Sequence, residues 1–117
     1  MLLRDHMTKN PVTIGPQEML ATAQEKMTTG RFRRLPHVEN GALHGILTDR
    51  DVNRYVGVEE WTKVRAAMTE TPLTISPDMP FEEATQLLLK HHISGLPVLE
   101  RNNVVGMITT SDIFRRF

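Results

Sequence analysis

Two short stretches of the chain place a glycine, a hydroxyl and a carboxylate at one common spacing. "GILTDRD" covers residues 45–51 and "GMITTSD" covers residues 106–112, each at a change from a strand-like to a helix-like pattern. A carboxylate can accept two hydrogen bonds from the vicinal diol of a ribose. The first turn of a helix presents unpaired N–H groups that suit a phosphate, and a glycine lets a ligand approach the backbone. The spacing therefore predicts binding of a nucleotide-like ligand.

The two stretches belong to a tandem repeat. Placing Met7 over Met68, 61 positions further on, aligns "MTKNPVTIGP" with "MTETPLTISP", and the register continues without a gap to Asp51 over Asp112. Chance does not hold a register over such a length, which indicates an internal duplication. We expect repeat 1 at residues 7–55, a short helical connector at residues 56–66 and repeat 2 at residues 67–117.

The sequence predicts the same order of elements, β-α-β-β-α, in each repeat. "PVTI" and "PLTI" favour short extended segments, because a residue before proline avoids the helical region and Val, Thr and Ile favour strands. A helix with an apolar stripe follows, with Gly30 expected to end the first such helix and Asp78 expected to cap the second. The stripe residues are Leu20, Ala23 and Met27 in repeat 1 and Phe81, Ala84 and Leu88 in repeat 2.

Two strands around a turn come next, at residues 35–38 and 43–47 in repeat 1 and at residues 96–99 and 104–108 in repeat 2. The turn of repeat 1 contains Asn-Gly, a strong hairpin signal. The closing helices are expected to begin just after Thr48 and Thr109. One such repeat is too small to cover both faces of its own sheet. We therefore expect an α+β fold in which two pseudo-symmetric repeats pack sheet to sheet as one domain.

Composition excludes several classes of function. Lys plus Arg and Asp plus Glu are equal at 14 each and aromatic residues are 5%, which argues against nucleic-acid binding. The chain has no cysteine for disulfides or zinc thiolates and no apolar stretch long enough for a membrane helix. No catalytic triad, phosphate-binding loop or paired catalytic carboxylates are visible. These features predict a cytoplasmic protein that is not an enzyme and has no metal site.

The repeated motifs resemble the tandem CBS (cystathionine β-synthase) domain pair, also called a Bateman module. The resemblance is carried by "HMTKNPVTI" with "AMTETPLTI", by "RRLPHVENGALHGILTDRD" and by "ISGLPVLERNNVVGMITTSD". The closing "GMITTSDIFRRF" is similar to the CBS region of acetoin-utilisation-type proteins, where a further regulatory domain follows. The resemblance implies a regulatory module that senses AMP, ADP or ATP, or else S-adenosylmethionine or NAD. It also implies a homodimer and a regulated protein or a fused domain as partner.

The resemblance assigns two ligand sites, each built from both repeats. The acid and hydroxyl come from one repeat and the segment against adenine comes from the other. Site A would use Arg33, Arg34, Thr48, Arg50 and Asp51, with Leu73, Thr74 and Ile75 around the base. Site B would use Thr109, Ser111 and Asp112, with Val12, Thr13 and Ile14 around the base.

The two sites differ in positive charge. "RFRRLP" supplies three arginines where the matching "HISGLP" supplies none, and Arg50 stands where repeat 2 has Ser111. Guanidinium groups bind phosphate oxygens bidentately, so site A is predicted to be the better phosphate site. Site B is expected to hold adenosine, S-adenosylmethionine, a weaker nucleotide or nothing.

A simpler interpretation remains open for the two acids. An acid in the first turn of a helix is favoured by the helix dipole by about 0.3–1 kcal/mol, with no ligand involved. On that interpretation the repeat is a structural or protein-interaction scaffold whose clefts are empty. The adjacent His91 and His92 suggest a metal only weakly, because neighbouring side chains at a helix end diverge and no third ligand is near in sequence.

Overall fold

The fold was derived from a computed structural model, which describes residues 1–69 and 73–116. The chain divides into two compact units. We call Val12–Thr71 the first-repeat unit and Met1–Pro11 together with Pro72–Phe117 the second-repeat unit. No helix among the described residues is both long and apolar enough to cross a membrane.

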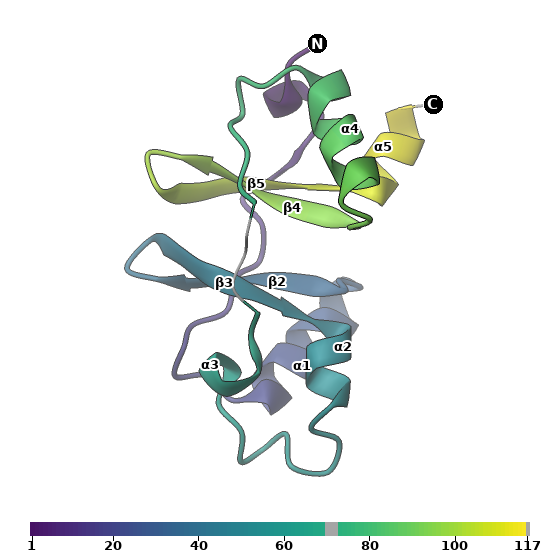
Figure 1. The fold of residues 1–117 in the computed structure, drawn as a ribbon. Coiled ribbons are helices and arrows are strands. Elements are labelled where there is room, and N and C mark those ends of the chain that lie inside the picture. Colours follow the sequence, from purple (N-terminus) through teal and green to yellow (C-terminus); the bar gives the residue numbers. More distant parts are fainter. Residues whose placement is uncertain (70–72, 117) are drawn as a thin grey trace. The chain divides into compact units, whose positions relative to one another are not determined.

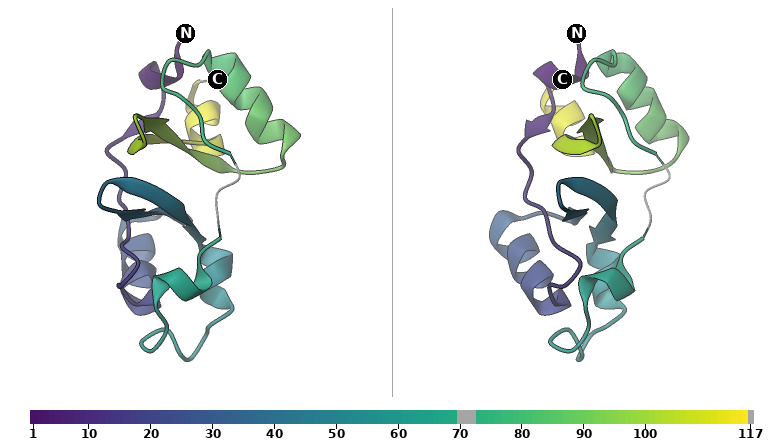
Figure 2. Two further views of the ribbon diagram at one scale, coloured as in Figure 1. Left: turned by 60° about the vertical axis from the view of Figure 1, so that its left-hand side comes forward. Right: turned by 90° about the vertical axis from the view of Figure 1, so that its left-hand side faces the viewer.

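The first-repeat unit is a hairpin covered on one face by helices (Figures 1 and 2). Its elements are α1 (Leu20–Gly30), β2 (Arg34–Glu39), β3 (Ala42–Thr48), α2 (Asp49–Asn53) and α3 (Val64–Ala67). The strands β2 and β3 are antiparallel, with a bulge after His37. The buried core consists of Ile14, Leu20, Ala23, Met27, Leu35, Leu47, Val52, Val64 and Ala67.

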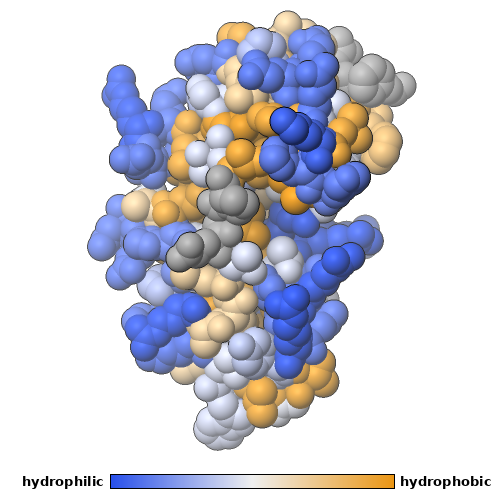
Figure 3. Space-filling view, viewed as in Figure 1, coloured by the Kyte–Doolittle hydropathy of each residue, from blue (hydrophilic) through white to orange (hydrophobic). Residues whose placement is uncertain are grey.

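The second-repeat unit has the same plan (Figure 1). Its elements are a 3-10 helix (Leu3–Asp5), β1 (Thr8–Lys9), α4 (Phe81–Lys90), β4 (Gly95–Glu100), β5 (Asn103–Thr109) and α5 (Thr110–Arg116). Its core consists of Leu3, Ile75, Phe81, Ala84, Leu88, Leu96, Val98 and Ile108. On the face seen in Figure 3, hydrophilic side chains cover much of the surface, and hydrophobic ones gather around the β4–β5 hairpin.

Both hairpins turn through two residues in the left-handed region. The φ angles are 53° at Asn40 and 81° at Gly41, and 53° at Arg101 and 68° at Asn102. Two successive left-handed residues match the twist of the flanking strands. The second turn reaches this geometry without a glycine, so its backbone is more strained than that of the first.

Each unit contains a short segment from the other repeat of the sequence, Met7-Thr8 in the second-repeat unit and Met68-Thr69 in the first-repeat unit. We call these the Met-Thr segments. Thr8 of β1 lies opposite Met107 of β5 in the second-repeat unit. In the first-repeat unit, Thr69 forms a bridge with Ile46 of β3. The exchanged segments begin further upstream than the Met-Thr residues. Leu3 and Val64 are matching positions, 61 residues apart, and both are completely buried. The compact units of the structure therefore do not coincide with contiguous repeats.

Most of the predicted elements are confirmed. The α+β class, both hairpins, the stripe residues of α1 and α4 as buried positions, and the helix starts at Asp49 and Thr110 are as predicted. The segments "PVTI" and "PLTI" contribute single bridges, of Ile14 to His37 and of Ile75 to Val98. The repeat boundaries 7–55, 56–66 and 67–117 stay a prediction.

Two local predictions are wrong, and a third is confirmed in a different geometry. Asp78 does not cap α4, whose N-cap is Pro80; its carboxylate instead pairs with Arg4 of the N-terminal segment. Residues 56–63 of the connector form turns rather than a helix, and α3 begins only at Val64. Helix α1 ends at Gly30 as predicted, although the left-handed residue that follows is Arg31, with φ 59°.

Candidate functional site

Asp51 closes a capping box at the start of α2. The Thr48 hydroxyl accepts a hydrogen bond from the Asp51 N–H at 3.2 Å, and the Asp51 Oδ2 accepts one from the Thr48 N–H at 2.9 Å. This reciprocal arrangement satisfies two backbone donors at the helix start. Asp51 is 3% exposed, so the carboxylate is held in one orientation.

Asp112 stands in the same arrangement at the start of α5. Its Oδ2 accepts from the Thr109 N–H at 2.9 Å and from the Thr109 hydroxyl at 3.0 Å, while the Asp112 N–H donates to that hydroxyl at 3.3 Å. Asp112 is 4% exposed. The simpler interpretation of both acids as helix-start residues is therefore correct as far as it goes, and ligand binding would be a second role for the same carboxylates.

Four residues that the sequence interpretation did not assign also contact the two acids. The Thr69 hydroxyl donates to Asp51 Oδ1 at 3.5 Å, and the Thr8 hydroxyl donates to Asp112 Oδ1 at 3.1 Å. These threonines belong to the exchanged Met-Thr segments. Each acid is also paired with an arginine three positions later, Arg54 at the C-cap of α2 and Arg115 in α5. Thr8 matches Thr69 and Arg54 matches Arg115 at the same offset of 61 positions. This identity between the repeats is the sequence signal that could have identified them.

The expectation of unpaired N–H groups at the start of α2 is wrong. The N–H of Asp49 donates to the Arg33 carbonyl at 2.9 Å, and the N–H of Arg50 donates to the Asp49 carboxylate at 2.9 Å. The third N–H, of Asp51, is taken by Thr48. With these donors occupied and α2 only five residues long, the backbone at this helix start does not supply a phosphate site.

The two motif glycines are needed for packing rather than for access by a ligand. A Cβ at Gly45 would lie 2.7 Å from the Thr69 carbonyl oxygen and 3.1 Å from the Met68 sulfur. A Cβ at Gly106 would lie 2.9 Å from the Thr8 carbonyl oxygen and 2.6 Å from the Met7 sulfur. The exchanged Met-Thr segments thus occupy the space that was expected to admit a ligand.

We expect Gly45→Ala and Gly106→Ala each to lower the free energy of unfolding by at least about 1 kcal/mol, because overpacking forces the Met-Thr segment away from the hairpin. Gly15→Ala serves as the control, since its added Cβ would meet nothing closer than 3.4 Å. Chemical denaturation measures all three. Equal stability of Gly45→Ala and Gly15→Ala would contradict the packing role.

The three arginines predicted for site A, Arg33, Arg34 and Arg50, lie close together in the first-repeat unit. Arg34 pairs with Thr48 in the hairpin, directly before α2. Burial lowers the pKa of Arg34, and the nearby positive charges of Arg33 and Arg50 lower it further, while Asp49 opposes the shift. A guanidinium surrounded by like charges is stabilised by a bound anion. The structure therefore brings a cluster of positive charge to the strand end that leads into Thr48 and Asp51.

The matching place in the second-repeat unit has no such charge. Gly95 pairs with Thr109, and the N–H of Thr110 donates to the Ser94 carbonyl at 3.0 Å, repeating the backbone of the first unit. The side chain of Ser111, where repeat 1 has Arg50, is exposed. The backbone is conserved between the repeats while the charge is not.

The residues predicted to lie around adenine are only partly exposed. Ile14 and Ile75 are buried at 1% and 4% exposure. Their isoleucine side chains support the cores, so a base could contact only the backbone or the neighbouring residues there. Val12 and Thr74 are exposed, and Thr13 and Leu73 are half-buried. The sharing of a ligand site between residues of the two repeats stays a prediction.

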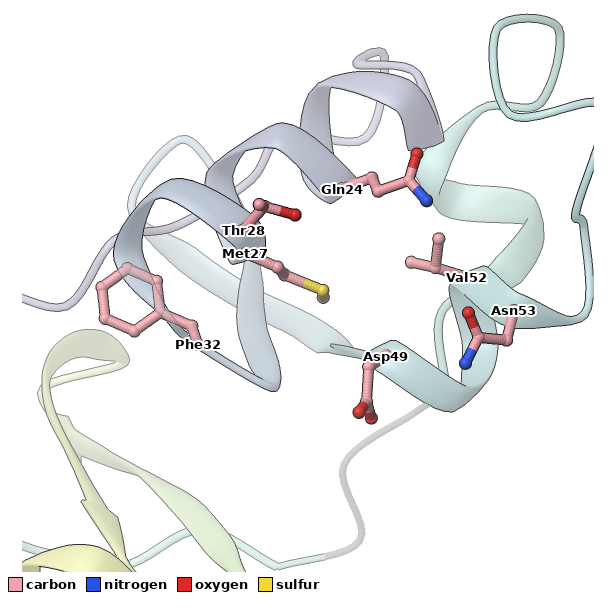
Figure 4. A pocket seen from close by; sticks show the side chains of 7 residues that line it. All are labelled: Gln24, Met27, Thr28, Phe32, Asp49, Val52 and Asn53. Carbon is pink, nitrogen blue, oxygen red and sulfur yellow. The ribbon is translucent and has the colours of Figure 1, made fainter.

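A pocket of about 230 Å³ lies on the helical side of the first-repeat unit (Figure 4). It is lined by Gln24, Met27, Thr28, Phe32, Asp49, Val52 and Asn53. None of the residues assigned to site A lines it. Its polar groups are two amides, a hydroxyl and a carboxylate with no cation, which does not suit a phosphate.

The candidate metal ligands are not gathered. His91 and His92 are exposed at the end of α4. Within residues 1–69 and 73–116, no group of three or more His, Cys, Asp or Glu is placed to hold a metal ion.

Comparison with known proteins identifies the family. The family model of the CBS domain matches residues 3–58 and 64–117. The chain is 32% identical over 114 residues to the CBS domain-containing protein YhcV of Bacillus subtilis, an alignment that covers 95% of this chain and 81% of that protein. The protein belongs to the CBS domain family, as a tandem pair.

Two solved structures extend the comparison. A Vibrio cholerae protein assigned as the acetoin utilization protein AcuB is 28% identical with a TM-score of 0.91, over 99% of this chain and 89% of that chain. The CBS domain pair of protein MJ0100, solved in complex with 5′-methylthioadenosine and S-adenosyl-L-methionine, is 28% identical with a TM-score of 0.89. That alignment covers 100% of this chain and 95% of that chain. The predicted resemblance to a CBS pair is confirmed.

Proposed function

We propose that this protein is a regulatory module that binds an adenine nucleotide or a related adenosyl ligand and performs no catalysis. Two observations carry the proposal: Arg33 and Arg50 lie near Arg34, which pairs with Thr48 in the hairpin, and the Asp51 carboxylate, three positions after Thr48, is buried. A buried acid suits a ribose diol and a guanidinium cluster suits a phosphate. That the similar MJ0100 pair binds two adenosyl compounds supports the same ligand class here.

The difference between the repeats makes site A the one for phosphorylated ligands. Its candidate ligands are AMP, ADP and ATP, with Thr48 and Asp51 at the ribose. Site B, around Asp112 without the arginines, suits adenosine or S-adenosylmethionine. Ligand binding changes the affinity for a regulated protein or a fused domain by linkage, and a homodimer is the form in which we expect the module to act.

The internal contacts of the acids favour one competing function, a scaffold without a ligand. Both carboxylates already have intramolecular partners, and the Met-Thr segments fill the space above the glycines. In a scaffold these contacts would be the whole reason for the motif. A binding experiment separates the two functions.

The test is a thermal-shift and calorimetry panel of AMP, ADP, ATP, NAD and S-adenosylmethionine, with GTP as control, on wild type, Asp51→Asn and Asp112→Asn. Asparagine keeps an oxygen for the capping box but removes the charge. A ligand at a hundred times its dissociation constant adds about 2.7 kcal/mol of stability. Loss of a charge-assisted hydrogen bond of about 1.5–3 kcal/mol weakens binding about tenfold or more.

We expect Asp51→Asn to lose affinity for a phosphorylated adenine ligand and Asp112→Asn to keep it. The unfolding temperature without ligand shows for each variant whether the fold is intact. Wild type that binds none of the adenine ligands would contradict the sensor and favour the scaffold. Equal affinities in wild type and Asp51→Asn would contradict the assignment of the site.

A further inference from the structure

Both candidate ribose-binding acids are covered by an arginine three positions later in the chain. Arg54 Nη1 lies 3.4 Å from Asp51 Oδ1, and Arg115 Nη2 contacts Asp112 Oδ1. The acid side chains are 4% and 1% exposed, while those of the arginines are 71% and 72% exposed. Arg54 and Arg115 are 61 positions apart, so the same contact is formed independently in each repeat.

The acceptor positions of the acids are nearly all occupied. A carboxylate has about four positions for hydrogen-bond donors. Asp112 fills them with the Thr109 N–H, the Thr109 hydroxyl, the Thr8 hydroxyl and Arg115. Asp51 has three donors, the Thr48 N–H, Arg54 and the Thr69 hydroxyl, the last two at 3.4 and 3.5 Å. A diol needs two positions, so an internal donor has to leave each acid when a ribose binds.

The arginine is the donor that leaves at the lowest energetic cost. The Thr48 N–H is fixed by the capping box. Thr69 is held to β3 by two backbone hydrogen bonds to Ile46, of 2.8 and 2.9 Å. Arg54 instead reaches the acid from solvent on a long side chain that is 71% exposed, so its guanidinium returns to water when the contact opens and no backbone has to move.

We propose that Arg54 and Arg115 are intramolecular competitors of the ribose diol, which cover the acids in the unliganded protein and are displaced on binding. The inference rests on the proposed function and adds a determinant of affinity to it. Because Asp51 has one open acceptor position and longer contacts, its arginine is displaced more readily than that of Asp112. Site A is therefore filled first.

The test uses 5′-methylthioadenosine, an uncharged ligand with the ribose intact, and calorimetry on wild type, Arg54→Met and Arg54→Lys, each also carrying Asp112→Asn so that the binding measured is that at Asp51. Methionine keeps the length and apolar stem of arginine without its charge. Removing a competing pair of about 0.2–1 kcal/mol raises the affinity about 1.5- to 5-fold. We expect this rise for Arg54→Met and a smaller one for Arg54→Lys.

Ionic strength gives a readout that a merely structural role would not move. Salt screens the ion pair but leaves an uncharged ligand unaffected. We expect the affinity of wild type for 5′-methylthioadenosine to rise with salt and that of Arg54→Met to stay constant. Unchanged or weaker binding by Arg54→Met, with its unfolding temperature intact, would overturn the inference.

The two proposals fail in different ways. If wild type binds AMP or ATP, but Arg54→Met and wild type have the same affinity for 5′-methylthioadenosine, the proposed function stands and the competition is overturned. Wild type that binds no 5′-methylthioadenosine overturns the competition at Asp51, whereas the proposed function is judged by the whole ligand panel.

Discussion

Replacing Leu3 by alanine is expected to lower the free energy of unfolding of the second-repeat unit by about 2–5 kcal/mol, the usual cost of truncating a fully buried leucine. Leu3 is 0% exposed and packs in one core with Ile75, Phe81 and Leu88. The backbone holds it there, since its N–H donates to the Met79 carbonyl at 2.8 Å. The N-terminal segment is therefore part of this unit's core rather than a tail.

The matched control for this prediction is Leu2→Ala. Leu2 is the same residue type one position earlier, but it is 39% exposed. We expect it to cost about 1 kcal/mol or less. Chemical denaturation gives the two free energies, and native-state hydrogen exchange shows which amides lose protection. Equal costs for the two variants, or a loss confined to β2 and β3, would contradict the assignment of the N-terminal segment.

Replacing His37 by valine is expected to raise the free energy of unfolding by about 1–3 kcal/mol, the cost of leaving a buried polar group without a partner. His37 is 2% exposed in β2, and neither of its ring nitrogens has a hydrogen-bond partner among the described residues. At the matching position, repeat 2 has Val98, which is 0% exposed. The internal repeat thus supplies the replacement that this backbone already accepts.

The same variant is expected to remove a dependence of stability on pH. Burial lowers the pKa of His37, the nearby His44 adds to this, and Glu39 opposes it. The unfolded chain therefore takes up a proton below about pH 6.5 while the folded protein does not. Because the unfolded state binds more protons in that range, the stability of wild type falls with decreasing pH. His37→Val is expected to lose this part of the slope.

Denaturation curves from about pH 8 to about pH 5 measure the effect, across the range in which histidine titrates. His44→Val is the control, since His44 is exposed and repeat 2 has Val105 at its place. His44→Val should change the free energy of unfolding little near the upper end of this pH range. It should also keep most of the dependence of that free energy on pH. A His37→Val protein that is less stable than wild type throughout would show that the imidazole has a favourable role.

The elements of the fold could be predicted because each rests on local signals. The stripe Leu20, Ala23 and Met27 needs only helical spacing, and the Asn40-Gly41 turn needs only residues that tolerate a positive φ. The predictions fail where contacts between segments that are distant in the sequence determine the local structure. Asp78 has the residue type of a helix cap, but Arg4, far away in the sequence, pairs with its carboxylate. No local pattern contains that partner.

The candidate site shows the same limit. The spacing of Thr48 and Asp51 predicted the helix start correctly, because hydroxyl and acid three positions apart form a capping box. It did not predict that Thr69 and Arg54 contact the carboxylate or that Met68 and Thr69 pack against Gly45. These contacts depend on the exchange of the Met-Thr segments between repeats, which the duplication in the sequence does not reveal.

That exchange also sets the order in which the two units can be completed during synthesis. Every residue of the first-repeat unit, Val12–Thr71, has been translated once Thr71 is joined to the chain. The second-repeat unit needs Met1–Pro11, which are made before the first-repeat unit, and β5, which is made after it. Closing so long a loop costs more entropy and slows folding. On the ribosome, the N-terminal segment therefore has no β5 to pair with at the time when the first-repeat unit can already fold.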